Sequence, residues 1–178
     1  MSDRSYLAAI IIGSDSDRPL LEKSKVFNIL KACQISYKVS VISADRNPGI
    51  LRGYCAQARA DGVKVFIGAA GMSGRLPGSI AAETKYRVPV IGVAIPTKEF
   101  ADAIDAMLGI ARSPAGCPVI LAGIGRSGFD NAALISAQIL GMGEDEESKR
   151  IKKSHSDYLC RLHFQSESEK PQINCMQS

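Results

Sequence analysis

Three short stretches of this chain place glycines, hydroxyls and charged side chains directly after an apolar run. Hydroxyls and guanidinium groups can bind an anion such as phosphate, and a carboxylate can accept a proton from a reacting group. Side chains of this kind after apolar runs favour a site for a small anionic molecule. The stretches are GSDSDRP at 13–19, SADRNPG at 43–49 and GAAGMSGRLPG at 68–78.

The first stretch can bind an anion or simply cap a helix. Pro19 suits the first turn of a helix, whose free backbone N–H groups would then lie beside Ser14, Ser16 and Asp17. Such a helix end is a ready anion site. Ser16 or Asp17 can equally serve as the helix cap, and for this stretch taken alone capping is the preferred interpretation.

The second and third stretches carry arginines. Arg46 can hold a phosphate through two parallel hydrogen bonds, and Ser43 can donate another. In the third stretch, small residues let the backbone approach a ligand closely, and Arg75 can bind a second negative group. Each loop alone is a weak signal, but together they favour a phosphorylated small molecule as the ligand.

A regular alternation of strands and helices must bring these stretches together. Five apolar runs recur at intervals of roughly 25 to 30 residues, with helical spacing between them, as strand–helix–strand units require. The pattern predicts an α/β fold: a three-layer α/β/α sandwich around a parallel five-stranded sheet, with flavodoxin-like strand order 2-1-3-4-5. Parallel strands all end at one edge, so the loops after the five strands should converge there. The runs are LAAIIIG, YKVSVISA, VKVFIGAAG, VPVIGVAIP and CPVILAGIG.

Composition argues against several other classes of protein. The length of 178 residues and 46% hydrophobic content suit one domain with its own core. The five cysteines include no Cys-x-x-Cys pair, which argues against a zinc site or a disulfide framework and favours a reduced, cytoplasmic protein. The apolar run 7–12 is too short to span a membrane, and a net charge of +4 with mostly dispersed basic residues disfavours nucleic acid as a partner.

Histidine chemistry is not expected in the body of the chain. The only histidines, His155 and His163, lie in the charged C-terminal part, so neither a Ser-His-Asp arrangement nor a histidine metal site is predicted. GSDSDRP has one glycine and matches neither a dinucleotide-binding loop nor a Walker loop. Redox-cofactor and nucleotide-hydrolysis functions are therefore disfavoured.

The C-terminal part differs in composition from the rest. Acidic residues precede basic ones in EDEESKRIKK, an order that complements a helix dipole and predicts a helix over about 144–164. We divide the chain into an α/β domain, residues 1–143, and a charged helix with a tail, residues 144–178. Two placements of the helix are open: against a neighbouring subunit, or in solvent. The last residues are typical of a frayed tail.

The order of the motifs resembles the PurE family, which contains 5-(carboxyamino)imidazole ribonucleotide mutases and aminoimidazole ribonucleotide carboxylases. GSDSD stands where the family has Gly-Ser-x-Ser-Asp, and SADRNP where it has Ser-Ala-His-Arg-Thr-Pro. RLPGSIAAET corresponds to His-Leu-Pro-Gly-Met-Ile-Ala-Ala, and VPVIGV and NAAL follow in the family's order. The resemblance runs from about residue 8 to residue 140.

The resemblance implies an activity and a set of contacts. Family members move a carboxylate from the exocyclic nitrogen of an aminoimidazole ribonucleotide to a ring carbon during purine synthesis. They use no metal or organic cofactor and assemble as homo-octamers with active sites between subunits. The implied partner is a phosphoribosyl substrate. The implied substrate-binding residues are Ser14, Ser16, Asp17, Ser43, Arg46, Gly71, Met72, Ser73, Arg75 and Leu76.

The chain departs from the family pattern at two histidines. Asp45 stands in place of the histidine that shuttles a proton, and Arg75 in place of the histidine before Leu-Pro-Gly. Residues 72–74 replace Gly-Ala-Ala, and residues 111–114 replace Gln-Met-Pro. Histidine exchanges protons near neutral pH, whereas a carboxylate beside arginines tends to stay an anion. The added arginines suggest a ligand with more negative charge, or one whose carboxylate is held.

Asp45 therefore has two interpretations. In the first, it is the proton-transfer residue of a mutase-like or carboxylase-like enzyme, acting as a base, or as a donor if burial outweighs the arginines. In the second, it forms an ion pair with Arg75 that closes an inactive site. The chain would then be a repurposed relative that binds a phosphoribosyl ligand as a sensor or an assembly protein.

Overall fold

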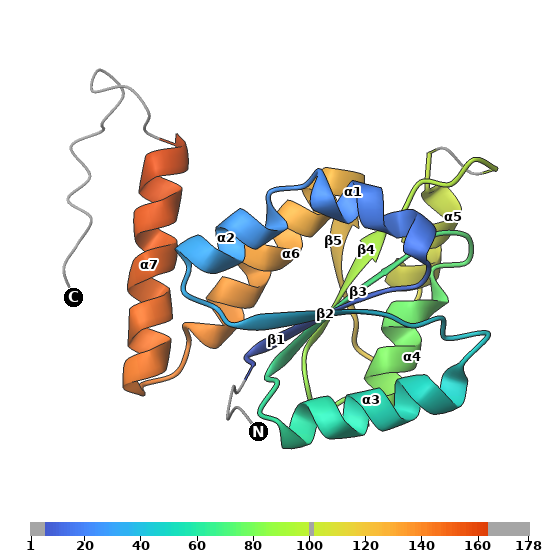
Figure 1. The fold of residues 1–178 in the computed structure, drawn as a ribbon, viewed down its shortest axis with the longest axis horizontal. Coiled ribbons are helices and arrows are strands. Elements are labelled where there is room, and N and C mark those ends of the chain that lie inside the picture. Colours follow the sequence, from blue (N-terminus) through green and yellow to red (C-terminus); the bar gives the residue numbers. More distant parts are fainter. Residues whose placement is uncertain (1–5, 100–101, 164–178) are drawn as a thin grey trace.

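A five-stranded parallel sheet forms the centre of the protein. The computed structural model describes residues 6–99 and 102–163 (Figure 1). The strand order is β2-β1-β3-β4-β5, with every neighbouring pair parallel, which confirms the predicted flavodoxin-like order. The strands are β1 (Ala8–Ile12), β2 (Tyr37–Val41), β3 (Val65–Ala70), β4 (Val90–Ala94) and β5 (Ile120–Ile124).

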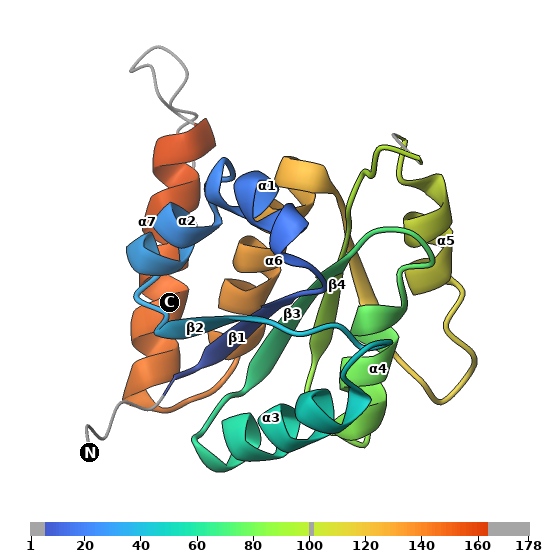
Figure 2. The same ribbon diagram turned by 45° about the vertical axis from the view of Figure 1, so that its right-hand side comes forward.

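Helices cover both faces of the sheet and give the predicted three layers (Figures 1 and 2). Alternate residues of β1 point to opposite faces: Ile10 and Ile12 pack in the core under α2 and α6, and Ala9 and Ile11 in the core over α3 and α4. The helices are α1 (Arg18–Glu22), α2 (Val26–Ala32), α3 (Pro48–Ala60), α4 (Arg75–Glu83), α5 (Ile104–Ala111), α6 (Gly125–Leu140) and α7 (Glu146–His163), with a 3-10 helix η1 at Asp15–Asp17.

Only the three central strands of the sheet are buried on both sides. Every residue of β1, β3 and β4 is buried. The edge strands differ: β2 carries Lys38 and Ser40 and is half-buried, while Ile120 and Ile124 of β5 remain exposed. Edge strands have one neighbour instead of two, so fewer side chains cover them.

The C-terminal helix α7 packs on its own chain, against α6 and α2, so it is not simply solvated (Figure 2). It begins at Glu146 because the carboxylate of Asp145 accepts hydrogen bonds from the Ser148 N–H at 3.0 Å and the Ser148 hydroxyl at 2.8 Å. Ile151 is fully buried against the core. Packing against a neighbouring subunit stays a prediction for the face that α7 leaves exposed.

One further hydrogen bond ties α7 to the body: Gln34 Nε2 donates to Ser154 Oγ at 2.6 Å. The predicted end of this helix at residue 164 and the predicted tail lie outside the described residues. The division into residues 1–143 and 144–178 stays a prediction. Within the ranges that the structure describes, no helix has the length and apolar content needed to cross a membrane.

Candidate functional site

One cleft opens at the carboxyl edge of the sheet, where β1 lies between β2 and β3. Ile12 pairs with Val41 of β2 and with Ala69 of β3, so the segments that follow these three strands lie side by side. The cleft has a volume of about 270 Å³. Every residue predicted for the site lines it: Ser14, Ser16, Asp17, Ser43, Asp45, Arg46, Gly71, Met72, Ser73, Arg75 and Leu76, together with Gly13, Ala44, Ala70 and Thr97.

The loops after the last two strands contribute little to this cleft. Thr97, which follows β4, lines it, but no residue after β5 does. The convergence expected of all five strand ends is therefore limited to four. Two features account for this: β5 lies at the far edge of the sheet, and α6 begins at Gly125 directly after the strand. No loop is left there to reach the cleft.

The loop after β1 is organised by a reciprocal cap. Ser14 Oγ accepts from the Ser16 N–H at 3.4 Å and the Ser16 hydroxyl at 2.9 Å, and the Asp17 carboxylate accepts from the Ser14 N–H at 3.1 Å. Capping is thus carried by Ser14, not by Ser16 or Asp17 alone. Burial raises the pKa of Asp17, and the hydrogen bond from Ser14 opposes this rise. The hydroxyls still face the cleft, so capping and ligand contact are compatible.

The loop after β2 holds Ser43 and Arg46 in a tight turn. The Arg46 N–H donates to Ser43 Oγ at 3.2 Å, and the Asn47 N–H donates to the Ser43 carbonyl at 3.0 Å. Pro48 then starts α3. Because Ser43 Oγ accepts from the turn, its own proton is available for a ligand. The Arg46 guanidinium is exposed and has no ion pair in the described part of the chain. It can therefore bind an anion.

The loop after β3 is pressed against α5 by two glycines. Gly74 adopts φ +62°, and a side chain there would collide with the carbonyl of Ala106. A side chain on Gly109 of α5 would collide in turn with the carbonyl of Ser73. Met72, also at positive φ, leaves half of its surface exposed toward the cleft. The loop's backbone therefore forms a fixed wall of the site.

Leu76 contributes less than predicted, because its side chain belongs mainly to the core. It is 3% exposed and packs in the same cluster as Ile80 and Phe66. Only a small part of its surface reaches the cleft. Among the residues predicted from the third stretch, Met72, Ser73 and Arg75 have the exposed side chains.

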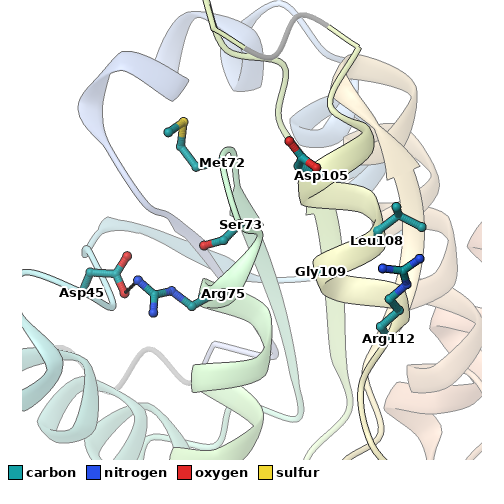
Figure 3. A pocket seen from close by; sticks show the side chains of 8 residues that line it. All are labelled: Asp45, Met72, Ser73, Arg75, Asp105, Leu108, Gly109 and Arg112. Carbon is teal, nitrogen blue, oxygen red and sulfur yellow. Dashed lines mark ion pairs between the residues drawn. The ribbon is translucent and has the colours of Figure 1, made fainter.

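Asp45 and Arg75 form an ion pair at the mouth of the cleft. Arg75 Nη2 lies 2.9 Å from Asp45 Oδ1, and the two side chains are 66% and 58% exposed (Figure 3). Asp45 is therefore not buried within its own chain. This exposure makes the pair weak, since exposed ion pairs contribute at most about 1 kcal/mol. A ligand can separate these two side chains at little cost.

A second cavity adjoins the cleft on the side of α5. It measures about 700 Å³ and shares four lining residues with the cleft: Asp45, Met72, Ser73 and Arg75. Its other wall comes from α5 and the residue after it: Asp105, Leu108, Gly109 and Arg112. We call this cavity the α5 groove. Sequence reasoning missed Asp105 and Leu108, which lie far along the chain from the glycine-rich stretches and carry no local signal.

The described part of the chain holds no cluster of the side chains that usually bind metal ions. Within residues 6–99 and 102–163, no group of three histidine, cysteine, aspartate or glutamate side chains gathers where it could hold an ion. None of the four cysteines in that part of the chain forms a disulfide there, and Cys33 and Cys55 are buried.

Comparison with known proteins places the chain in a family. A relative from Pyrococcus abyssi, named N5-carboxyaminoimidazole ribonucleotide mutase, is 38% identical over 148 residues, which cover 83% of this chain and 81% of the relative. One from Bacillus subtilis with the same name is 37% identical over 145 residues, 82% of this chain and 86% of the relative. A "probable" mutase from Methanobrevibacter smithii is 40% identical over 149 residues, but this chain spans only 42% of its length.

The fold agrees with these sequence relationships. The crystal structure of Treponema denticola PurE superposes with a TM-score of 0.70 at 28% identity, covering 85% of this chain and 88% of the other. Residues 7–158 match the AIR carboxylase family, a range that includes the whole sheet and most of α7. This chain belongs to the AIR carboxylase (PurE) family.

Proposed function

We propose that this protein transfers a carboxylate on an aminoimidazole ribonucleotide-like substrate, as a mutase or a related carboxy-lyase of purine synthesis. The relatives' printed names support the substrate class. The observation that carries the proposal for this chain is the gathering of all its predicted site residues around one cleft. We infer that it needs no metal or organic cofactor, and that it works in the cytoplasm as a homo-octamer.

The two loops on either side of β1 would hold the phosphoribosyl part. Ser43 can donate its hydroxyl proton to the phosphate, and the N–H groups of the exposed Arg46 guanidinium can donate to it as well. Ser14, Ser16 and Asp17 would contact phosphate or ribose across the cleft. The wall formed by 71–76 would then lie along the heterocycle and its carboxylate.

Asp45 would be the proton-transfer residue in place of the family's histidine. In the proposed migration, the bond between the exocyclic nitrogen and the carboxylate carbon breaks, and carbon dioxide is retained. The nitrogen takes a proton from solvent water, carbon dioxide bonds to the ring carbon, and that carbon loses its proton to a base, which returns it to solvent. Asp45, an exposed carboxylate at the cleft mouth, supplies the base, and Arg75 can hold the carboxylate of the substrate.

A second function is favoured by the same ion pair. Arg75 occupies one oxygen of Asp45 at 2.9 Å, so in this arrangement the carboxylate is already engaged by a cation of its own chain. A protein that binds a phosphoribosyl ligand without turning it over, as a sensor or an assembly partner, fits this arrangement. The chain would then be a divergent family member that has lost both active-site histidines.

Single-turnover kinetics separates the two functions. Protein in excess is mixed with carboxyaminoimidazole ribonucleotide, and carboxylate migration is followed by rapid quench, while calorimetry measures the binding of the decarboxylated ribonucleotide. If the protein is a catalyst, the wild type turns the substrate over and Asp45→Asn abolishes this turnover. The control Arg59→Ala, on the exposed face of α3, should leave turnover intact. Binding without turnover would refute carboxylate transfer on this substrate and support the function as a sensor or assembly partner.

A further inference from the structure

The α5 groove is larger than the cleft and has a charged side chain that the proposed chemistry does not use. Its volume is about 700 Å³, against about 270 Å³ for the cleft. Arg112 lines only the groove, and Arg46 lines only the cleft. In the described residues, neither guanidinium takes part in an ion pair. Each cavity thus has its own exposed cation.

Of the other charged residues that line the groove, Arg75 and Asp45 neutralise each other, and Asp105 lies at the opposite end from Arg112. Arg75 is turned toward Asp45 and pairs with it, away from Arg112, as Figure 3 shows. Asp105 precedes Arg112 by seven residues along α5, which is a rise of roughly 10 Å. Between 106 and 118, Arg112 is the only charged residue. The end of the groove at Arg112 therefore favours an anion.

The two cavities meet at the wall they share. Asp45, Met72, Ser73 and Arg75 line both, so a ligand whose phosphate lies at Arg46 can extend past Ser73 into the groove. Ser73 is exposed there and presents a hydroxyl. A phosphoribosyl group in the cleft places its heterocycle at this wall. A substituent on that heterocycle is the part of the ligand that can enter the α5 groove.

We propose that the α5 groove is a second anion subsite, in which Arg112 binds a carboxylate or phosphate carried on the heterocycle of a ligand whose phosphoribosyl group lies in the cleft. This inference rests on the proposed function and narrows its substrate class. The ligand is a phosphoribosyl heterocycle with a side chain long enough to pass Ser73 and an anionic group at the end of that chain.

Two matched probes test the subsite by calorimetry at low salt. The first is 5-aminoimidazole-4-carboxamide ribonucleotide, whose only anionic group is its phosphate. The second is its N-succinyl derivative, which adds two carboxylates on a short chain at the carboxamide nitrogen and leaves the ribose phosphate as it is. We expect the wild-type protein to bind the second probe about tenfold more tightly, as one charged hydrogen-bonded contact allows. The preference should shrink as ionic strength rises.

Three substitutions locate the contact. Arg112→Gln should remove the tenfold preference and leave the affinity of the unsubstituted probe unchanged. Asp105→Asn removes a negative charge that would repel the carboxylates of the succinyl probe, so the affinity for this probe should rise about twofold. Arg59→Gln, on the exposed side of α3, should change neither affinity. Equal binding of both probes by the wild type, or a preference retained in Arg112→Gln, would overturn the inference.

The outcomes also separate this inference from the proposed function. Arg46→Gln should weaken both probes equally, because it acts on the phosphate. If it weakens neither, the phosphate cleft and the subsite both fail. If it weakens both while Arg112→Gln has no effect, the cleft stands and the subsite fails. If Arg112→Gln abolishes both affinities and also changes the mass measured by light scattering, a second copy of the chain covers the groove, and the subsite again fails.

Discussion

Arg75 Nη2 and Asp45 Oδ1, 2.9 Å apart, join the loop after β2 to the start of α4 across the mouth of the cleft. The pair lines both the cleft and the α5 groove.

Histidines at both positions of the pair should increase carboxylate migration. In the double variant Asp45→His, Arg75→His, imidazole can give and take a proton near neutral pH, so we expect the single-turnover rate at pH 7 to rise about 100-fold. The control, Asp45→Gln with Arg75→Gln, removes the ion pair without adding a proton carrier and should show no rise. Two folded variants with equally low rates would show that another part of the loop limits the reaction.

A methyl group on Gly109 should destabilise the protein. Gly109→Ala drives a side chain into the Ser73 carbonyl, and we expect the free energy of unfolding to fall by about 1–3 kcal/mol. The matched control is Gly53→Ala in α3, where nothing lies within 4 Å and alanine favours the helix, so stability should rise by about 0.5–1 kcal/mol. Urea unfolding measures both. Changes of the same sign would contradict the close approach.

Mild acid should weaken the protein through His155 on α7. Its Nε2 atom is buried and has no hydrogen-bond partner among residues 6–99 and 102–163, and burial lowers the pKa of His155 below its ordinary value of about 6.5. As pH falls below 6.5, the unfolded chain takes up a proton that the folded chain does not, so the free energy of unfolding decreases. We expect the urea midpoint to drop between pH 7.5 and 5.5.

The substitution His155→Gln removes the titrating group and should reduce that drop. His163→Gln, at the exposed last residue of α7, is the control and should keep it. The carboxylates with lowered pKa values, Asp61 and Asp145, titrate at lower pH and do not mask the effect. An unchanged acid response in His155→Gln would assign the sensitivity to other groups.

Cys55 should resist alkylation in the folded protein. Its side chain is fully buried, and burial, aided by the charge of Glu83, raises the pKa of Cys55 to about 11. At pH 8 almost no thiolate is present, whereas the half-buried Cys117 is more accessible to iodoacetamide. Mass spectrometry of the native protein should find Cys117 modified first, and both modified in urea. Early labelling of Cys55 would show that α3 opens locally.

The same shift gives stability an alkaline limit. A thiol whose pKa is raised on folding keeps its proton when the unfolded chain has lost its own, so stability declines as pH rises from about 9 toward 11. Cys55→Ala lacks this group. Its free energy of unfolding should therefore decrease less steeply over that range than that of the wild type, and a parallel decrease would refute the assignment.

The sheet and the cleft could be predicted because they follow from local patterns. Buried parallel strands are read from continuous apolar runs, and the segments after β1, β2 and β3 must meet because the strands end at one edge. The docking of α7 could not be read in this way. It depends on contacts between residues far apart in the chain, such as Gln34 in the turn after α2 and Ser154 in α7, for which neither segment has a distinctive signal.

The positions of side chains relative to one another could not be predicted from the sequence either. The Asp45–Arg75 pair was one of two interpretations, and only the turn geometry of the loop after β2 shows that the carboxylate reaches the guanidinium. The α5 groove was not predicted, because the contact between Gly109 and the Ser73 carbonyl joins segments that no sequence motif links. Glycines at such positions look like ordinary helix residues until the opposing backbone is seen.

The two glycine contacts between 71–75 and α5 also bear on how a ligand is admitted. Backbone lies directly on backbone at Gly74 and at Gly109, with no side chain between them that could change rotamer. The wall therefore cannot adjust one residue at a time. It moves together with α5 or stays in place, so the ligand meets a preformed surface on that side, and adjustment to the ligand is left to exposed side chains such as Arg46 in the loop after β2.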